Sequence, residues 1–263
     1  MTEPLLLTTT RVSTFRGRQS LTAATAFFFA RGDRLFAVTS RHVLHDEETG
    51  HFPDRIELVL HVDATDLTRT VLFSVLLYRE GSAIWRQGID SAGPVDVAVL
   101  ELDRKSLPAD VVLQAFEPRH LQAVTADVEV GASLRVVGFP LGFYDTLHNL
   151  PVVRHAIIAS SFGVRFQGQG YFLTDGRMHR GSSGAPVVMR HDADPAFPWR
   201  LLGVHAARMD MNNRDLQNDD VLGLNCAWYA DILMTLTEDD AVSSEAEMGP
   251  RPGQRPRVPP KRP

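Results

Sequence analysis

Short apolar segments separated by turn residues dominate the sequence from residue 20 to about residue 225. These segments are rich in β-branched and aromatic residues, and they have the length of strands. Residues 22–30 and 35–40, for example, flank the turn Arg31-Gly32-Asp33 and predict a hairpin. Long helical patterns do not alternate with the segments, which argues against a doubly wound α/β fold. The sequence therefore predicts an all-β fold, either a sandwich or a pair of barrels.

The other segments divide the chain into two halves and a tail. Further strands are expected at residues 56–62, 71–77, 95–100, 134–138, 152–160, 162–166, 171–174, 186–189 and 199–206, and a helix at residues 225–236. Residues 79–94 and 209–220 predict polar loops, and the proline-containing residues 104–123 predict a linker. We expect an N-terminal unit at residues 1–110, a C-terminal unit at residues 111–237, and a disordered tail at residues 238–263.

The composition argues against several classes of function. A hydrophobic fraction of 44% over 263 residues is enough for an ordinary core, and a net charge of −5 gives no indication of nucleic-acid binding. No segment reaches the roughly 18 apolar residues of a membrane helix, and the first residues lack the basic region of a signal peptide. Cys226 is the single cysteine, which excludes an internal disulfide. We therefore expect a soluble, cytoplasmic protein without a nucleic-acid or membrane partner.

The segment Arg180-Gly181-Ser182-Ser183-Gly184-Ala185-Pro186 places two adjacent hydroxyl groups between glycines. Glycine allows tight backbone conformations that other residues resist. Such a turn can expose a hydroxyl group while backbone N–H groups converge on one point, which is the arrangement of a nucleophile beside an oxyanion hole. Taken alone, the segment could equally be a flexible polar turn.

Two upstream segments supply the groups that a serine nucleophile needs. His42 follows an apolar strand, and Asp96 lies inside the apolar run Val95-Asp96-Val97-Ala98-Val99-Leu100. A serine hydroxyl requires an adjacent base, and a carboxylate can fix the tautomer of a histidine base. Singly, His42 could be a surface histidine and Asp96 a buried acid that binds backbone N–H groups. Their occurrence together with Ser183, in the order His, Asp, Ser and within a β pattern, favours a catalytic triad.

These three segments resemble the trypsin/chymotrypsin-like serine proteases, in particular the HtrA-type protease domain of bacteria without its PDZ domain. Ser40-Arg41-His42-Val43 is similar to the segment that carries the base in that family. Asp96-Val97-Ala98-Val99-Leu100 is similar to the strand with the orienting acid, and Gly181-Ser182-Ser183-Gly184 to the nucleophile loop. The resemblance covers roughly residues 20–236. It implies two six-stranded antiparallel β-barrels with the site between them, and a C-terminal helix.

The resemblance also implies a function and roles for single residues. Ser183 would be the nucleophile, His42 the general base and Asp96 the residue that orients it. The backbone N–H groups of Gly181 and Ser183 would form the oxyanion hole. The chain would then be a serine endopeptidase that cleaves protein or peptide substrates through an acyl-enzyme, without a cofactor or a metal.

The substrate pocket is less well defined by the resemblance. The position six residues before the nucleophile, Arg177, corresponds to the base of the pocket in the family, and Val204-His205-Ala206 would line its wall. A cationic base and a histidine in the wall would favour an acidic residue before the scissile bond. Alternatively, Arg177 points to solvent and His205 only packs. Ala185 replaces the second glycine of the family's motif, and Arg41 replaces a small residue before the base.

Three other interpretations use the same residues. An α/β-hydrolase has the order Ser, Asp, His and a Gly-x-Ser-x-Gly turn, so this interpretation is rejected. A metal site at His42 and His45 lacks further ligands. A catalytically silent protease fold that binds peptides or a partner would retain the same three residues. A regulatory protein partner is also compatible with the sequence.

Overall fold

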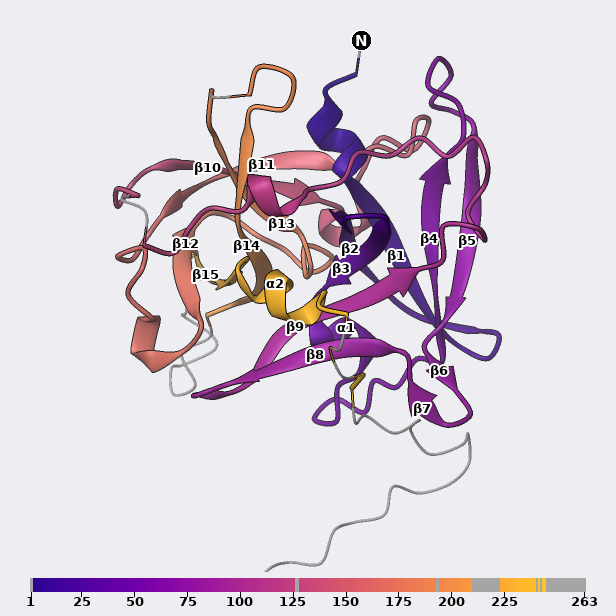
Figure 1. The fold of residues 1–263 in the computed structure, drawn as a ribbon, viewed down its shortest axis with the longest axis horizontal. Coiled ribbons are helices and arrows are strands. Elements are labelled where there is room, and N and C mark those ends of the chain that lie inside the picture. Colours follow the sequence, from indigo (N-terminus) through magenta and orange to yellow (C-terminus); the bar gives the residue numbers. More distant parts are fainter. Residues whose placement is uncertain are drawn as a thin grey trace, which may run out of the picture.

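The computed structural model describes residues 2–125, 128–192, 194–209, 223–239, 241 and 243–244. Strands dominate this part of the chain, and they form two units that lie side by side (Figure 1). The all-β prediction is therefore confirmed. The loop expected at residues 209–220 and the tail expected at residues 238–263 lie largely outside the described residues.

The N-terminal unit is a seven-stranded sheet with the strand order β5-β4-β1-β2-β3-β9-β8. All neighbouring strands in it are antiparallel. Its strands are β1 (Thr9–Arg16), β2 (Gln19–Arg31), β3 (Arg34–Thr39), β4 (Arg55–His61), β5 (Thr70–Leu76), β8 (Trp85–Asp90) and β9 (Gly93–Leu102). A separate small hairpin consists of β6 (Tyr78–Arg79) and β7 (Ser82–Ala83). This unit has seven strands in one sheet, whereas the sequence predicted a six-stranded barrel.

The C-terminal unit is a closed barrel of six strands, the number that the resemblance implied, in the order β10-β11-β12-β15-β14-β13. Its strands are β10 (Ser133–Gly138), β11 (Val152–Ile158), β12 (Tyr171–Asp175), β13 (Pro186–Arg190), β14 (Trp199–Arg208) and β15 (Leu224–Tyr229). The described helices are short: α1 (Arg41–Leu44), α2 (Ile232–Leu236), and the 3₁₀ turns η1 (Pro4–Thr8), η2 (Pro118–His120), η3 (Pro140–Gly142) and η4 (Phe166–Gly168). None of the described helices has the length and apolar character required to cross a membrane.

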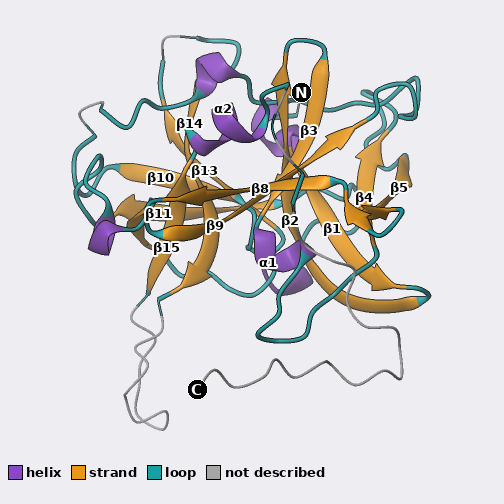
Figure 2. Ribbon diagram, turned by 60° about the horizontal axis from the view of Figure 1, so that its bottom comes forward, coloured by secondary structure: helices purple, strands orange, loops and turns teal. Residues whose placement is uncertain are grey.

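Three buried clusters form the core. One fills the N-terminal unit around Trp85 and Leu58, and another fills the barrel around Phe172 and Val187. The third contains residues from both units, among them Phe27 and Trp228, so it joins them. In Figure 2 the one-turn helix α1 lies between the two strand systems. His42, which lies in α1, is therefore placed where the two β units meet.

Several local predictions differ from the structure. Strand β1 was not predicted, because its sequence is rich in threonine and has few large apolar residues. Residues 79–94, expected as a loop, contain the β6–β7 hairpin and β8. Residues 162–166, expected as a strand, form a turn that precedes η4, although the Phe162 side chain is buried.

The segment expected as one helix over residues 225–236 is divided between β15 and α2. Trp228 alternates with its neighbours: it packs in the cluster between the units, whereas Ala227 and Tyr229 face the barrel interior. A two-residue period is the period of a strand. The predicted C-terminal helix exists, but it begins only at Ile232.

Candidate active site

The nucleophile loop connects β12 to β13 and places Ser183 at the boundary between the units. The Ser183 carbonyl accepts a hydrogen bond from Thr25 N–H in β2, at 3.0 Å. Gly184 has φ +84, and a Cβ there would lie 2.2 Å from the Thr25 carbonyl oxygen and 2.3 Å from Thr39 Oγ1. The glycine is therefore needed both for the backbone conformation and for the close approach of the N-terminal sheet.

His42 and Asp96 are brought together by α1 and β9. The Asp96 carboxylate accepts one hydrogen bond from His42 N–H at 2.9 Å, and its other oxygen lies 2.7 Å from His42 Nδ1. Because an ionised carboxylate can only accept, Nδ1 carries the proton and Nε2 is left as the basic atom. Both oxygens of Asp96 hold one residue, so the imidazole is fixed in position and in tautomer.

The protonation of His42 is set by two opposing effects. Burial lowers its pKa, but the hydrogen bond and the charge of Asp96 raise it by more, so the pKa of His42 lies above its ordinary value. Asp96 thus stabilises the imidazolium form of His42, which is the form that a general base takes after it accepts a proton.

Ser183 is not hydrogen-bonded to His42 in this structure. Its hydroxyl group donates instead to the carbonyl oxygen of Ala206 in β14, at 3.1 Å. Strand β14 also binds the loop at Gly184, whose N–H donates to the carbonyl of His205 at 2.8 Å. The same carbonyl accepts from Ser40 Oγ at 3.2 Å. Ser183, Gly184 and Ser40 therefore all contact one segment of β14, and the serine hydroxyl donates to that strand.

The backbone of Gly181 is oriented by a contact on its N-terminal side. The carbonyl of Arg180 accepts from Leu141 N–H at 2.5 Å, and Gly181 has φ +91. The C=O and N–H of a trans peptide point in opposite directions, so Gly181 N–H points away from Leu141. Within the described residues, the N–H groups of Gly181 and Ser183 have no backbone or side-chain acceptor. These two N–H groups are therefore available as hydrogen-bond donors, as the predicted oxyanion hole requires.

Sequence reasoning missed Thr25, which is fully buried in β2. Its hydroxyl donates to the carbonyl of Gly181 at 2.7 Å and accepts from Phe139 N–H at 3.1 Å. Its own carbonyl accepts from Thr39 Oγ1 at 2.7 Å. Thr25 thus holds the nucleophile loop and the β10–η3 connection from the opposite unit. A threonine in a strand gives no sequence indication of such a contact.

The residues predicted for the substrate pocket have different environments. The Arg177 side chain is exposed, and its carbonyl accepts from Arg154 Nη2 at 2.8 Å. Val204 and Ala206 are buried in the cluster between the units. His205 is 2% exposed, and its Nδ1 has no hydrogen-bond partner in the described chain. Burial, together with the charge of His42, lowers the pKa of His205 to about 4, so its imidazole is neutral at pH 7.

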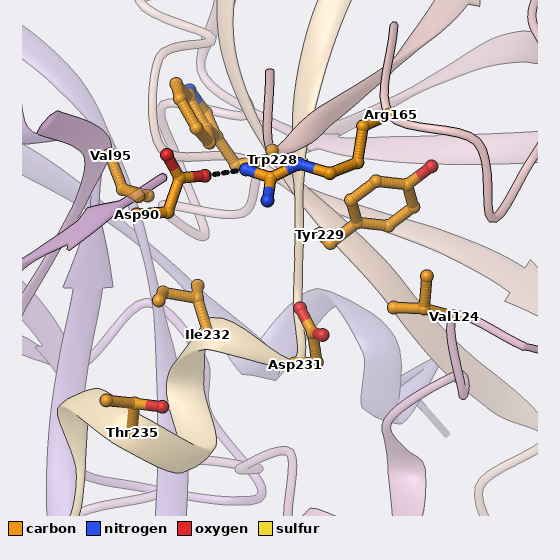
Figure 3. A pocket seen from close by; sticks show the side chains of 10 residues that line it. Asp90, Val95, Val124, Arg165, Trp228, Tyr229, Asp231, Ile232 and Thr235 are labelled. Atoms are coloured by element: carbon orange, nitrogen blue, oxygen red, sulfur yellow. Dashed lines mark hydrogen bonds and ion pairs between the residues drawn. The ribbon is translucent and has the colours of Figure 1, made fainter. Parts of the chain in front are cut away.

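A separate cavity of about 230 Å³ lies at the junction of the two units (Figure 3). Arg165 and Asp90 form an ion pair at it, and Trp228, Asp231 and Ile232 are among the other residues of its wall. No predicted catalytic residue lines this cavity. It is therefore distinct from the cluster of His42, Asp96 and Ser183.

Comparisons with known proteins agree with this architecture. Residues 24–194 match the family model of the trypsin-like peptidase domain. The chain belongs to the trypsin-like peptidases. The family and the chymotrypsin-like fold therefore agree with those that the sequence predicted. No curated protein matches the chain. Across the described residues, no group of three or more histidine, cysteine, aspartate or glutamate side chains is placed to hold a metal ion.

One solved structure shows the same fold at low sequence identity, and a second is reported as similar. A serine endoprotease from Yersinia pestis is 14% identical with a TM-score of 0.52, and the match covers 87% of this peptidase and 61% of that chain. The peptidase thus spans about three fifths of its length. A protein of M. tuberculosis, solved as an inactive mutant, is 14% identical with a TM-score of 0.49, over 88% of this chain and 85% of that one.

Proposed function

We propose that this peptidase is an endopeptidase that cleaves peptide bonds through His42, Asp96 and Ser183. The observation that supports this most directly is the double hydrogen bond from His42 to Asp96, which leaves Nε2 as the basic atom. The second requirement is a site for a developing oxyanion, and its support is that the N–H groups of Gly181 and Ser183 have no acceptor in the described chain.

The proposed reaction forms an acyl-enzyme. The Ser183 hydroxyl turns from Ala206 to His42, and Oγ attacks the peptide carbonyl carbon while its proton passes to Nε2. The oxyanion accepts from Gly181 N–H and Ser183 N–H. His42 then gives the proton to the leaving amine as the C–N bond breaks. Water repeats the sequence on the acyl-enzyme and releases the carboxylic acid and free Ser183.

Labelling by a fluorophosphonate probe tests the nucleophile. We expect the wild type to be labelled and Ser183→Ala to lose both labelling and hydrolysis, because the probe needs an activated hydroxyl group. Ser182→Ala is the matched control in the same loop and should retain substantial activity. Full activity of Ser183→Ala, or loss of activity in Ser182→Ala alone, would contradict the assignment.

We also propose a preference for an acidic residue before the scissile bond. The support is the unpaired Nδ1 of His205 on the strand that contacts Ser183 and Gly184. A substrate carboxylate would raise the low pKa of this histidine, so binding would take up a proton. Preference for glutamate over glutamine, measured as the ratio of kcat/KM, should therefore increase as pH falls and disappear in His205→Ala. Equal rates for both substrates at every pH would refute it.

A catalytically silent binding module is the second candidate. The hydrogen bond from Ser183 to Ala206 favours it, because this rotamer directs the hydroxyl away from His42. In that case folded wild type would not react with the probe, yet it would bind peptides. A regulatory protein partner that turns the hydroxyl would restore labelling.

The cytoplasm is the compartment that we propose. Cys226, the single cysteine of the sequence, is buried in the structure. A fold that depends on no disulfide is compatible with a reducing environment.

A further inference from the structure

Strand β5 is a free edge of the N-terminal sheet, and it is unusually apolar for an edge. It is the terminal strand of the sheet and has β4 as its one neighbour (Figure 1). Its seven residues, Thr70–Leu76, include no charged residue, proline or glycine. Leu72 and Leu76 are 66% and 62% exposed. Edge strands in native proteins are normally protected by charges, proline or bulges. The lack of such protection indicates that something pairs with β5.

The unpaired hydrogen-bonding groups of β5 can be assigned from the bonds at its ends. Leu77 N–H donates to the Asp54 carbonyl at 2.9 Å, and Val62 N–H donates to the Arg69 carbonyl at 3.1 Å. Bonding alternates along an antiparallel pair, so the odd-numbered residues of β5 bond to β4. The backbone groups of residues 70, 72, 74 and 76 therefore point away from the sheet. No bond outside the ladder occupies them in the described part of the chain.

We propose that β5 pairs with β5 of a second copy of this chain, antiparallel and centred on Ser74. The outward residues are symmetric about this centre. A two-fold axis there places Leu72 beside the partner's Leu76, with Ser74 beside the partner's Ser74. Residues 72, 74 and 76 all direct their backbone N–H and C=O groups away from β4. In the dimer these groups would therefore bond to the same groups of the partner strand.

The opposite face of the strand is self-complementary in the same register. Phe73 falls beside the partner's Val75, and Val71 beside the partner's Leu77. Phe73 and Val75 are half-buried against the core of the N-terminal unit. Pairs of an aromatic and a β-branched residue stabilise neighbouring strands. The dimer would continue both the outer surface and the core of the sheet.

The molecular mass in solution tests this pairing. Sedimentation of the wild type over a range of concentrations should show a species of twice the monomer mass. The double variant Leu72→Lys, Leu76→Lys should sediment as a monomer, because it opposes charges across the seam. Val164→Lys is the control, since Val164 is 61% exposed but lies in the C-terminal unit. A wild type that is monomeric throughout, or a dimer that survives the double variant, would overturn the proposal.

Cysteine pairing tests the register independently, in a Cys226→Ala background. In a hydrogen-bonded antiparallel pair the Cα atoms are about 5.5 Å apart, which a disulfide can span. Ser74→Cys should therefore give a disulfide-linked dimer under mild oxidation. Leu72→Cys alone should give none, because two copies of residue 72 would be about 13 Å apart. A linked dimer from Leu72→Cys without one from Ser74→Cys would disprove this register.

Discussion

Thr25 lies outside the proposed catalytic triad but binds the loop that carries Ser183. Its hydroxyl group contacts the carbonyl of Gly181 and the N–H of Phe139, so Thr25→Val leaves two buried polar groups without a partner. An unsatisfied buried group costs about 1–3 kcal/mol. We expect kcat to fall while KM changes little, because the variant displaces the proposed oxyanion donor Gly181 and leaves the substrate surface intact. Thr25→Ser keeps the hydroxyl group and should restore kcat, whereas an equal loss in both variants would point to packing alone.

The His42–Asp96 pair predicts a specific dependence on pH. His42 acts as a base only when neutral, and Asp96 raises its pKa, so kcat/KM should rise with pH through a midpoint above the ordinary histidine value. Asp96→Asn removes the charge and the fixed tautomer. We expect kcat to fall by about 10⁴-fold and the midpoint of any residual activity to move to lower pH. An unchanged pH profile in this variant would contradict the role of Asp96.

Stability should depend on pH through the same histidine. The pKa of His42 is higher in the folded than in the unfolded protein. The stabilisation of the fold by protonated His42 is therefore fully present below the pKa of this histidine in the unfolded chain, and it is lost as pH rises through the pKa in the folded protein.

Gly184 should tolerate no side chain. Alanine there would need a left-handed backbone, which costs about 1–2 kcal/mol, and its Cβ would also clash with Thr25 and Thr39. Gly32→Ala provides a matched control, because Gly32 has φ +58 and a Cβ at this position would meet no atom within 4 Å. In thermal unfolding, Gly184→Ala should lower Tm much more than Gly32→Ala. Equal shifts would show that the loop absorbs the contact.

At the scale of elements, the sequence predicts most strands. It does not predict strands of polar composition or the strand that is apolar on both faces. Strand β8 contains Arg86, Gln87 and Gly88, so it has the composition of a loop. It forms because α2 packs on it: a Cβ at Gly88 would lie 3.2 Å from Ile232 Cδ1. Strand β15 is apolar on both faces, and periodicity cannot separate such a run from a helix. These assignments depend on neighbours that are distant in the sequence.

Some residues of the candidate site could also be predicted from the sequence, and others could not. The triad could be predicted, because each member lies in a short segment with a recognisable composition. Thr25 and Leu141 could not, because each acts on the backbone of the nucleophile loop. The contact from Thr25 to Gly181 spans 156 positions of sequence, and backbone acceptors leave no trace in the residue types around them.

For the whole molecule, the order of the nucleophile loop depends on both units. Ser183 belongs to the C-terminal barrel, but its carbonyl and that of Gly181 are bound by Thr25 of the N-terminal sheet. His42 in α1 and Asp96 in β9 also belong to the N-terminal unit. The proposed boundary near residue 110 therefore separates the nucleophile from its base and from the residue that holds its loop.

Because the two units contribute different groups to the proposed site, the site could be assembled from two separate fragments. Two polypeptides cut between the units would each carry an incomplete set of reactive groups, and hydrolysis would reappear only when they associate. Fused to a pair of interacting proteins, the fragments would report that encounter as an enzymatic signal. Activity in the absence of an encounter would depend on how strongly the fragments associate by themselves through the apolar cluster that both units share.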